Sequence, residues 1–334
     1  MRRAHCPLQT QAKPTTQGGP SRRSPPMPQP AQAYTLAQNM RGAGIMVACT
    51  GIFTVHDALM KLVAAEIGLW EAIFLRGCIA STLLAVFTAR LERSRLRLAR
   101  ADLRALSWRT VGEMGSTLMF LAALFHIPFA NATAILQVAP LAMTLAAALL
   151  LRERVGWRRS LAIAVGFGGV MLIVRPGTEG FTAWSLCALG AVGFLVMRDF
   201  STRSLSRAVP SVLVAFVAAS SLTLTGAAGL VVTGWTAPSP ATLAQVGLAG
   251  LLVTAGYIMI TMAMRTGDMS FIAPFRYTAL VWALILGMLL FADFPRPLTY
   301  AGAGLVVATG LFTFLRERAL GRKAERAAAG TPPR

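Results

Sequence analysis

The stretch AILQVAPLAMTLAAALLLRERVGWRRSLAIAVGFGGVMLIVRPG (residues 134–177) contains two long apolar runs separated by a basic loop. A helix that crosses the hydrocarbon core of a bilayer needs about 20 mainly apolar residues. The first run has Pro140 in its middle, and the second is rich in glycine and ends at Arg175. The stretch therefore predicts two consecutive transmembrane helices joined by a short loop.

Similar apolar runs fill the chain from Ala43 to Arg316. Hydrophobic residues make up 55% of the 334 residues and charged residues only 13%, which is too little charge to cover a soluble globule of this length. We expect an all-α integral membrane protein with ten transmembrane helices, at residues 43–64, 68–87, 107–127, 129–151, 159–174, 181–200, 211–233, 243–264, 271–291 and 299–315.

The positions of the basic residues predict the orientation of these helices. Cytoplasmic loops are rich in Lys and Arg. With the N-terminus inside, 27 of the 32 Lys and Arg residues fall in inside segments, and only Arg175 and Arg296 fall in outside loops. The pattern predicts that both termini are cytoplasmic and that the protein lies in a cell inner membrane.

The net charge of +19 is spread over short loops and the two tails. A nucleic-acid-binding protein would carry such charge on a soluble domain, so we expect no nucleic-acid partner. Residues 1–40 are predicted to form a disordered basic N-terminal tail, and residues 317–334 a cytoplasmic C-terminal tail with a disordered end. Met40 leads directly into the first apolar run and is a more natural start than Met1 or Met27.

The second half of the chain repeats markers of the first half at an offset near 140 residues. Asp57 and Lys61 close the first span, as Asp199 and Arg203 close the sixth, 142 residues later. The unit is five helices, an odd number, so the two copies must cross the membrane in opposite directions. The expected repeats are residues 41–178 and 179–316, and inverted repeats of this kind place a substrate site at their interface near the midplane.

The stretch 134–177 and its counterpart APFRYTALVWALILGMLLFADFPRPLTYAGAGLVVATGLFTFLRER (273–318) resemble the drug/metabolite transporter superfamily, in particular its ten-helix EamA-type members. The second copy departs from the pattern, because it has Leu280 where Pro140 would be expected and Asp293 in place of Glu153. The resemblance implies a secondary transporter for a small metabolite. Uptake of a vitamin or nucleoside-like compound, such as riboflavin or S-adenosylmethionine, ranks first. Export of amino acids, metabolites or drugs is the alternative.

Ionisable residues inside a bilayer are costly and usually face the interior of the helix bundle. Arg76 lies near the middle of the second span, and its fork of donors suits a carboxylate or phosphate. The alternative is an internal ion pair with Glu71 or Glu113 that only holds helices together.

Asp57 and Lys61 are four residues apart, as are Asp199 and Arg203, so each pair can form on one helical face. These pairs lie toward span ends, where gates close, although an intrahelical pair without a gating role is the simpler interpretation. The Gly-rich fifth and tenth spans, by contrast, are expected to allow close helix packing.

Glu113 is predicted to be a buried acid with few partners, which makes it the leading candidate to carry a coupled proton, with His56 second. Gln137 lies beside Pro140, which removes one backbone hydrogen bond in mid-membrane. The side chains predicted to line a cavity at this level are Gln137, Tyr257, Arg276, Tyr277 and Trp282.

No cofactor and no metal site are expected, because the sequence has neither ligand spacing nor a nucleophile–base motif. The expected partners are a small-molecule substrate and the lipid bilayer, and a non-transporting scaffold or receptor is the alternative from another class. An enzyme is not expected. The sequence leaves open whether transport is coupled to protons and whether the chain forms a homodimer.

Overall fold

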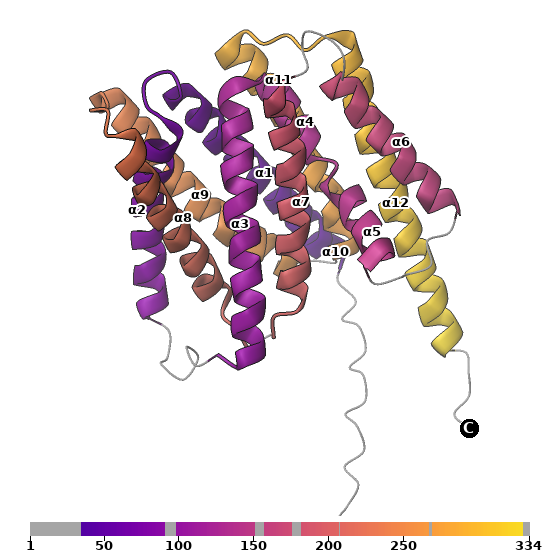
Figure 1. Ribbon diagram of the computed structural model, residues 1–334. Coiled ribbons are helices and arrows are strands. Elements are labelled where there is room, and N and C mark those ends of the chain that lie inside the picture. The colour runs from indigo at the N-terminus through magenta and orange to yellow at the C-terminus, as the bar shows by residue number, and fades with distance from the viewer. Residues whose placement is uncertain are drawn as a thin grey trace, which may run out of the picture. The chain divides into compact units, whose positions relative to one another are not determined.

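The computed structural model describes residues 35–90, 98–150, 157–175, 182–206, 208–266 and 269–329. All regular elements in these ranges are helices (Figure 1). They are α1 (Leu36–Val63), α2 (Leu69–Ala89), α3 (Arg100–His126), α4 (Phe129–Leu136), α5 (Ala139–Leu150), α6 (Trp157–Val174), α7 (Ala183–Arg203), α8 (Ser211–Thr233), α9 (Pro240–Thr266), α10 (Met269–Ile272), the 3-10 helix η2 (Ala273–Tyr277), α11 (Thr278–Phe291) and α12 (Pro297–Ala329).

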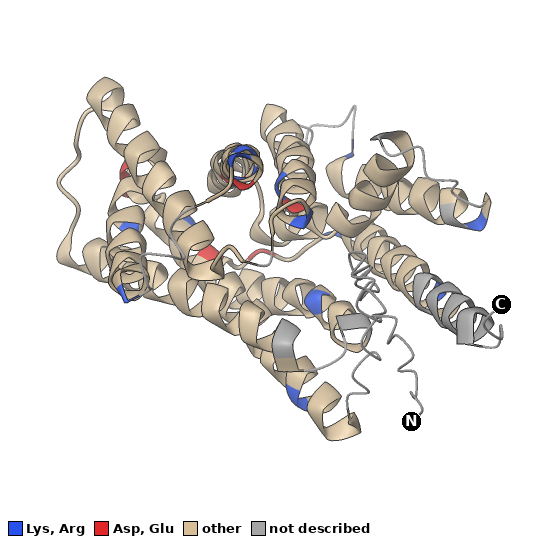
Figure 2. Ribbon diagram, turned by 90° about the horizontal axis from the view of Figure 1, so that it is seen from below, with Lys and Arg blue, Asp and Glu red and all other residues tan. Residues whose placement is uncertain are grey.

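Each of the ten predicted spans falls on one of these helices or on a broken helix. Eight helical segments are long and apolar enough to cross a membrane. The other two are α3, which has five charged residues in its first half, and α6, whose apolar part, Ser160–Val174, is shorter. Figure 2 shows long stretches of the described helices without any charged residue. The fold class is therefore all-α with multiple membrane-spanning helices.

The fourth and ninth segments are interrupted in mid-course. The fourth is divided into α4 and α5 at Gln137 and Val138, just before Pro140, which cannot donate a helical hydrogen bond. The ninth contains η2, which has Pro274 in its first turn. The break in the second half therefore comes from Pro274, six positions before Leu280, where the repeat had predicted the counterpart of Pro140.

Both ends of the helical region extend beyond their predicted limits. Thr35 and Gln38 form a capping box that begins α1 at Leu36, so residues 36–40 are helical although we expected a disordered tail. The last helix, α12, runs to Ala329 because Ala, Leu, Arg, Lys and Glu, all strong helix formers, dominate residues 316–329. The tail up to residue 34, the marker Glu153 and residues 330–334 lie outside the described residues.

Helices from the first half of the chain pack mainly against helices from the second half. The most extensive contacts join α3 to α7, α1 to α9, α2 to α8 and α6 to α12. Figure 1 shows α6 beside α12 at one side of the bundle and α2 beside α8 at the other. The two halves therefore interleave and do not form two separate bodies.

Glycines allow α6 and α12 to approach closely, as predicted for the Gly-rich fifth and tenth spans. A Cβ atom at Gly169 would lie 2.7 Å from the carbonyl oxygen of Gly302, closer than real Cβ contacts allow. Without a hydrophobic drive between helices in lipid, such close backbone packing is a main source of helix association.

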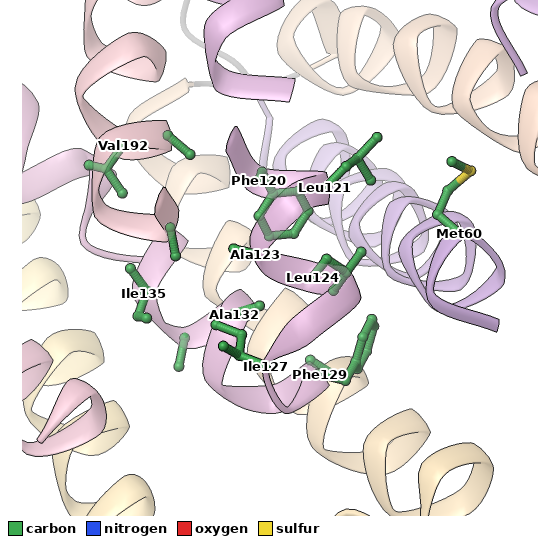
Figure 3. Close-up of a cluster of buried hydrophobic side chains, with 14 of the residues drawn as sticks. Met60, Phe120, Leu121, Ala123, Leu124, Ile127, Phe129, Ala132, Ile135 and Val192 are labelled. Carbon is green, nitrogen blue, oxygen red and sulfur yellow. The ribbon is translucent and has the colours of Figure 1, made fainter. Parts of the chain in front are cut away.

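The largest buried cluster extends through the bundle and includes residues of α1 to α9, α11 and α12. Figure 3 shows the part of it near the ends of α1 and α3, with Met60 of α1, Phe120, Leu121, Ala123 and Leu124 of α3, Ile127 after that helix and Phe129 of α4. Met60, Leu124 and Phe129 are completely inaccessible. A smaller cluster of Met46, Ala263 and Ile272 lies where α1 begins and α9 ends.

Candidate functional site

Glu113 lies in the middle of the bundle and has partners on two other helices. Glu113 is only 4% exposed. The hydroxyl of Tyr257 on α9 donates to Glu113 Oε1 at 2.9 Å. Two guanidinium groups approach Oε2, that of Arg198 on α7 at 3.6 Å and that of Arg109, one turn earlier on α3, at 3.5 Å. Glu113 therefore links α3, α7 and α9.

Two glycines of α3 bring α7 close enough for these contacts. A Cβ atom at Gly112 would lie 2.7 Å from the backbone nitrogen of Arg198, and one at Gly115 would collide with the ring of Phe194. The backbone of α7 therefore runs directly against the face of α3 that carries Glu113.

Arg198 also binds the residue next to it. Its Nε donates to Asp199 Oδ1 at 2.9 Å, and its Nη2 lies 2.8 Å from the same oxygen. Arg198 is thus shared between Glu113 and Asp199. Asp199 also interacts electrostatically with Arg276 of η2.

A second chain of polar contacts joins α1 to α2. Nη1 of Arg76 lies 3.3 Å from His56 Nε2, and His56 Nδ1 lies 2.9 Å from Asp57 Oδ1. A guanidinium can only donate, so His56 accepts at Nε2 and donates at Nδ1 to Asp57. This arrangement fixes a neutral His56 between Arg76 and Asp57.

Arg76 connects the two groups of polar side chains. It interacts electrostatically with the carboxylates of Asp57 and Glu113. The resulting charged network comprises His56, Asp57, Arg76, Arg109, Glu113, Arg198, Asp199, Tyr257 and Arg276. The structure therefore brings together residues that the sequence placed separately on the first, second, third, sixth, eighth and ninth spans.

The breaks in the fourth and ninth segments meet each other. Nε2 of Gln137 donates to the backbone carbonyl of Arg276 at 3.2 Å. The side chain of Arg276 is exposed, and that of Gln137 is half-buried. These two predicted site residues therefore lie together.

Tyr277 and Trp282 make separate contacts outside the charged network. The hydroxyl of Tyr277 is buried without a hydrogen-bond partner and lies against Gly310. The indole nitrogen of Trp282 donates to the carbonyl of Val47 at 3.2 Å, and its ring covers Gly51. Their roles in binding stay a prediction.

The two intrahelical pairs predicted at span ends do not form. Asp57 binds His56, whereas Lys61 Nζ donates to the carbonyls of Leu124 and Ile127 at 2.7 and 2.6 Å. The last carbonyls of α3 have no intrahelical partner and lie at the negative end of the helix dipole, so they attract the ammonium group. Lys61 also lies over the ring of Phe291, 5.7 Å from its centroid.

Asp199 pairs in the same way with its neighbour Arg198, not with Arg203 four residues on. Arg203 instead lies over the ring of Phe200, with 5.8 Å between guanidinium and ring centroid. The neighbouring guanidinium of Arg198 reaches both Asp199 and Glu113, which explains why the longer intrahelical pair is not formed.

One expectation about buried charge was wrong, and one alternative is not observed. Glu113 has three partners, where the sequence predicted few, because two of them come from helices distant in the chain. Within the described residues, Arg76 forms no ion pair with Glu71 or Glu113. Glu71 is buried and accepts a hydrogen bond from the backbone of Thr236 at 3.2 Å.

Sequence reasoning missed Arg198 and Arg109 as parts of the site. Arg198 precedes Asp199 as His56 precedes Asp57, 142 positions earlier, so the repeat offset was the signal that could have found it. Arg109 had been assigned to a cytoplasmic loop because it lies near the start of its apolar run.

Two cavities lie away from this network. One, of about 390 Å³, is lined by residues of α6 and α12, including Trp157, Arg158 and Phe312. The other, of about 500 Å³, lies between the first turns of α3 and α8. Neither is lined by the five residues predicted to surround a substrate.

Comparisons with known proteins find transporters among the proteins similar to this chain. Residues 40–175 match the EamA-like transporter family. The riboflavin transporter of Rhizobium johnstonii is 29% identical over 61% of this chain and 68% of its own length. The S-adenosylmethionine uptake transporter of Rickettsia prowazekii is 23% identical, over 79% of this chain and 89% of that protein.

An exporter also resembles the chain. The pseudopaline exporter of Pseudomonas aeruginosa is 26% identical over 79% of this chain and 93% of its own length. One solved crystal structure superimposes with a TM-score of 0.60 at 19% identity, covering 83% of this chain and 99% of that one, which supports the fold alone.

Proposed function

We propose that this chain, whose residues 40–175 match the EamA-like transporter family, is a secondary transporter that moves a small polar or amphipathic metabolite by alternating access. The observation that carries the proposal is the charged network, in which α1, α2 and α3 of the first half meet α7, α9 and η2 of the second. Buried ionisable residues in a membrane bundle commonly mark a substrate or ion pathway. An enzyme, a receptor or a scaffold has no comparable support.

The contacts support an arrangement of two inverted five-helix repeats. Thr223 Oγ1 donates to Ser81 Oγ at 3.5 Å, and these residues are 142 positions apart. An equivalent pair that meets in this way lies on the two-fold axis relating the copies.

Packing away from that axis supports the same arrangement. A Cβ atom at Gly256 would collide with the ring of Phe53, and one at Gly115 would collide with the ring of Phe194. Each residue of the first pair is 141 positions from its counterpart in the second. The contacts of α1 with α9 and of α7 with α3 are therefore equivalent.

The meeting of two broken helices supports a substrate site at the repeat interface. Interrupted helices in inverted-repeat transporters leave backbone groups free to bind a substrate near the midplane. Gln137, Arg276 and Tyr277 lie at the breaks, and Trp282 follows the second break along the chain. We assign binding or gating to these residues together with Arg76 and Tyr257.

Uptake of a vitamin or nucleoside-like compound into the cell is the first candidate activity, because relatives named for riboflavin and S-adenosylmethionine match this chain. Export is the second candidate, supported by the pseudopaline exporter. In both cases the distribution of Lys and Arg supports an inner-membrane location with both termini in the cytoplasm.

Lys61 supports a gate at the end of the bundle where α1 and α3 end. It joins α1 to the final carbonyls of α3, beside the largest buried cluster. Opening this end requires the Lys61 contacts to break.

The network also supports proton coupling, with two candidate groups. Protonation of His56 at Nε2 would remove the acceptor that Arg76 uses, which would separate α2 from α1. Protonation of Glu113 would weaken its attraction to Arg109 and Arg198. The contacts favour His56, because its neutral form joins α1 to α2 by accepting a hydrogen bond from Arg76, whereas its protonated form would repel that guanidinium.

Flux into proteoliposomes tests the function and the coupling together. Riboflavin and S-adenosylmethionine are the first substrates to assay, with and without an imposed pH gradient, for the wild type and for the Glu113→Gln and His56→Gln variants. We expect gradient-driven accumulation in the wild type, and counterflow without accumulation in the variant that lacks the coupling group. Wild-type flux that ignores the gradient would make the protein a facilitator or exchanger.

A further inference from the structure

The charged network contains more positive than negative side chains. Its described members include four guanidinium groups, those of Arg76, Arg109, Arg198 and Arg276, and three carboxylates, those of Asp57, Glu113 and Asp199. His56 adds no charge, because it accepts a hydrogen bond from Arg76. The network therefore has a net formal charge of +1.

The carboxylates of the network are already engaged elsewhere. Glu113 faces Arg109 and Arg198, Asp199 binds Arg198, and Asp57 binds His56. Within the part of the chain that the structure describes, neither Arg76 nor Arg276 forms an ion pair with a carboxylate.

Of these two guanidinium groups, that of Arg76 is buried and that of Arg276 is exposed, so Arg76 holds the surplus charge inside the bundle. This residue is 7% exposed, and its Nε is buried without a hydrogen-bond partner. Two nitrogens of Arg109, Nε and Nη1, are buried without partners as well. Burying a charge that is neither paired nor fully hydrogen-bonded costs several kcal/mol, so a ligand that supplies an acceptor stabilises this arrangement.

From this imbalance we infer that the substrate binds as an anion, through a carboxylate or phosphate group that pairs with the guanidinium of Arg76. A guanidinium presents parallel donors that match the oxygens of either group. Tyr257 and Phe53, whose rings meet edge to face with centroids 5.8 Å apart, provide aromatic surface next to the charged network for an attached ring. The inference rests on the proposed transport function and restricts its substrate class to compounds with a carboxylate or phosphate group, which include S-adenosylmethionine but not riboflavin.

Thermal unfolding of the purified full-length protein with simple anions tests the site without knowledge of the substrate. Sodium phosphate and sodium acetate are the probes, and sodium chloride at equal ionic strength is the reference. We expect phosphate or acetate to raise the midpoint by on the order of 3 °C at saturation. A larger effect of phosphate indicates a phosphate group in the substrate, and a larger effect of acetate a carboxylate.

Two substitutions at Arg76 and one elsewhere on the bundle complete the test. Arg76→Gln should abolish the anion-specific shift, and Arg76→Lys should reduce it, because an ammonium cannot make the paired contact. Arg104→Gln, at an exposed position of α3, should keep the full shift. No anion-specific shift in the wild type, or an equal shift in Arg76→Gln, overturns the inference.

Flux separates this inference from the proposed function. Riboflavin and riboflavin 5′-phosphate differ only in the phosphate group, and indole-3-acetamide and indole-3-acetate differ in the carboxylate. Flux of neutral members only would overturn the anionic class and leave the transport function standing. Specific binding of phosphate or acetate, with no flux for any compound of a wider metabolite library, would support the anion site and overturn transport.

Discussion

Glu113 is held by charge from two guanidinium groups and by one tyrosine hydroxyl. Replacing it with Gln keeps a similar shape but leaves Arg109 with no carboxylate partner and Arg198 with Asp199 alone. Removing one member of a buried ion pair is strongly destabilising, because the remaining charge stays desolvated. We expect Glu113→Gln to lower the free energy of unfolding by about 3 kcal/mol, measured by denaturant titration in detergent.

A double substitution checks the cause of that loss. Glu113→Gln combined with Arg109→Gln removes one charge of each sign, so it should recover part of the stability lost in the single variant. If the single variant is as stable as the wild type, Glu113 does not hold these helices together.

Glu66 gives the protein a pH-dependent contact outside the membrane-spanning segments. It lies between α1 and α2 and accepts hydrogen bonds from the hydroxyl of Thr242 and from the backbone and hydroxyl of Ser239. These hydrogen bonds lower the pKa of Glu66 below its ordinary value of 4.5, and the bond from Thr242 has the largest effect. The stabilisation is therefore fully present above pH 4.5 and is lost as the pH falls through the lowered pKa.

Thermal unfolding between about pH 6 and pH 3 measures this contribution. The midpoint of the wild type should fall more steeply below pH 4.5 than that of Glu66→Gln, in which residue 66 cannot titrate. Parallel curves for the two proteins would show that Glu66 adds nothing to the pH dependence.

Some of the site was predictable at the level of single residues. Arg76, Glu113 and Asp57 were recognisable because charge inside an apolar span is rare. Their partners were not, since Tyr257 is 144 positions from Glu113 and no spacing rule connects α3 with α9. The offset between the two halves could have identified Arg198, but this residue lies beside a predicted loop and was not considered part of the site.

At the scale of elements, the contact between α6 and α12 depends on one glycine and not on its neighbour. A side chain at Gly169 would meet the backbone of Gly302, whereas one at Gly168 would meet nothing within 4 Å. We expect Gly169→Val to lower the free energy of unfolding by roughly 1–3 kcal/mol and Gly168→Val to leave it nearly unchanged. Equal effects would mean that valine in α6, and not the helix contact, decides stability.

The helices were more predictable than their interruptions. The apolar runs of the sequence located every helical segment, eight of which are long and apolar enough to cross a membrane, because length and polarity are strong constraints in a bilayer. Pro140 indicated the break between α4 and α5. In the second half the repeat template pointed to Leu280, whereas Pro274 produces η2, so the break lies six positions earlier than the template predicted.

At the scale of the whole molecule, two sets of hydrogen bonds, each joining a loop to the start of a helix, mark two faces of the bundle. The loop after α1 binds the start of α9 through Glu66 and Ser239. The segment after α7 binds the first turn of α3, where Ser206 donates to Asp102 at 2.9 and 3.0 Å. In a two-fold inverted arrangement these contacts are counterparts, and they belong on opposite sides of the membrane.

Single cysteines at exposed positions of these two faces test the arrangement in cells. Ala237, between α8 and α9, belongs to the Glu66 face, and Ser204, after α7, belongs to the Asp102 face. In a variant without the four native cysteines, a membrane-impermeant maleimide should label Ala237→Cys on intact cells and Ser204→Cys only after permeabilisation. The reverse result would overturn the orientation derived from the basic loops and keep the inverted repeat. Labelling of both cysteines on intact cells would place the two loops on one side of the membrane, where no odd-numbered repeat can put them, and would overturn the repeat itself.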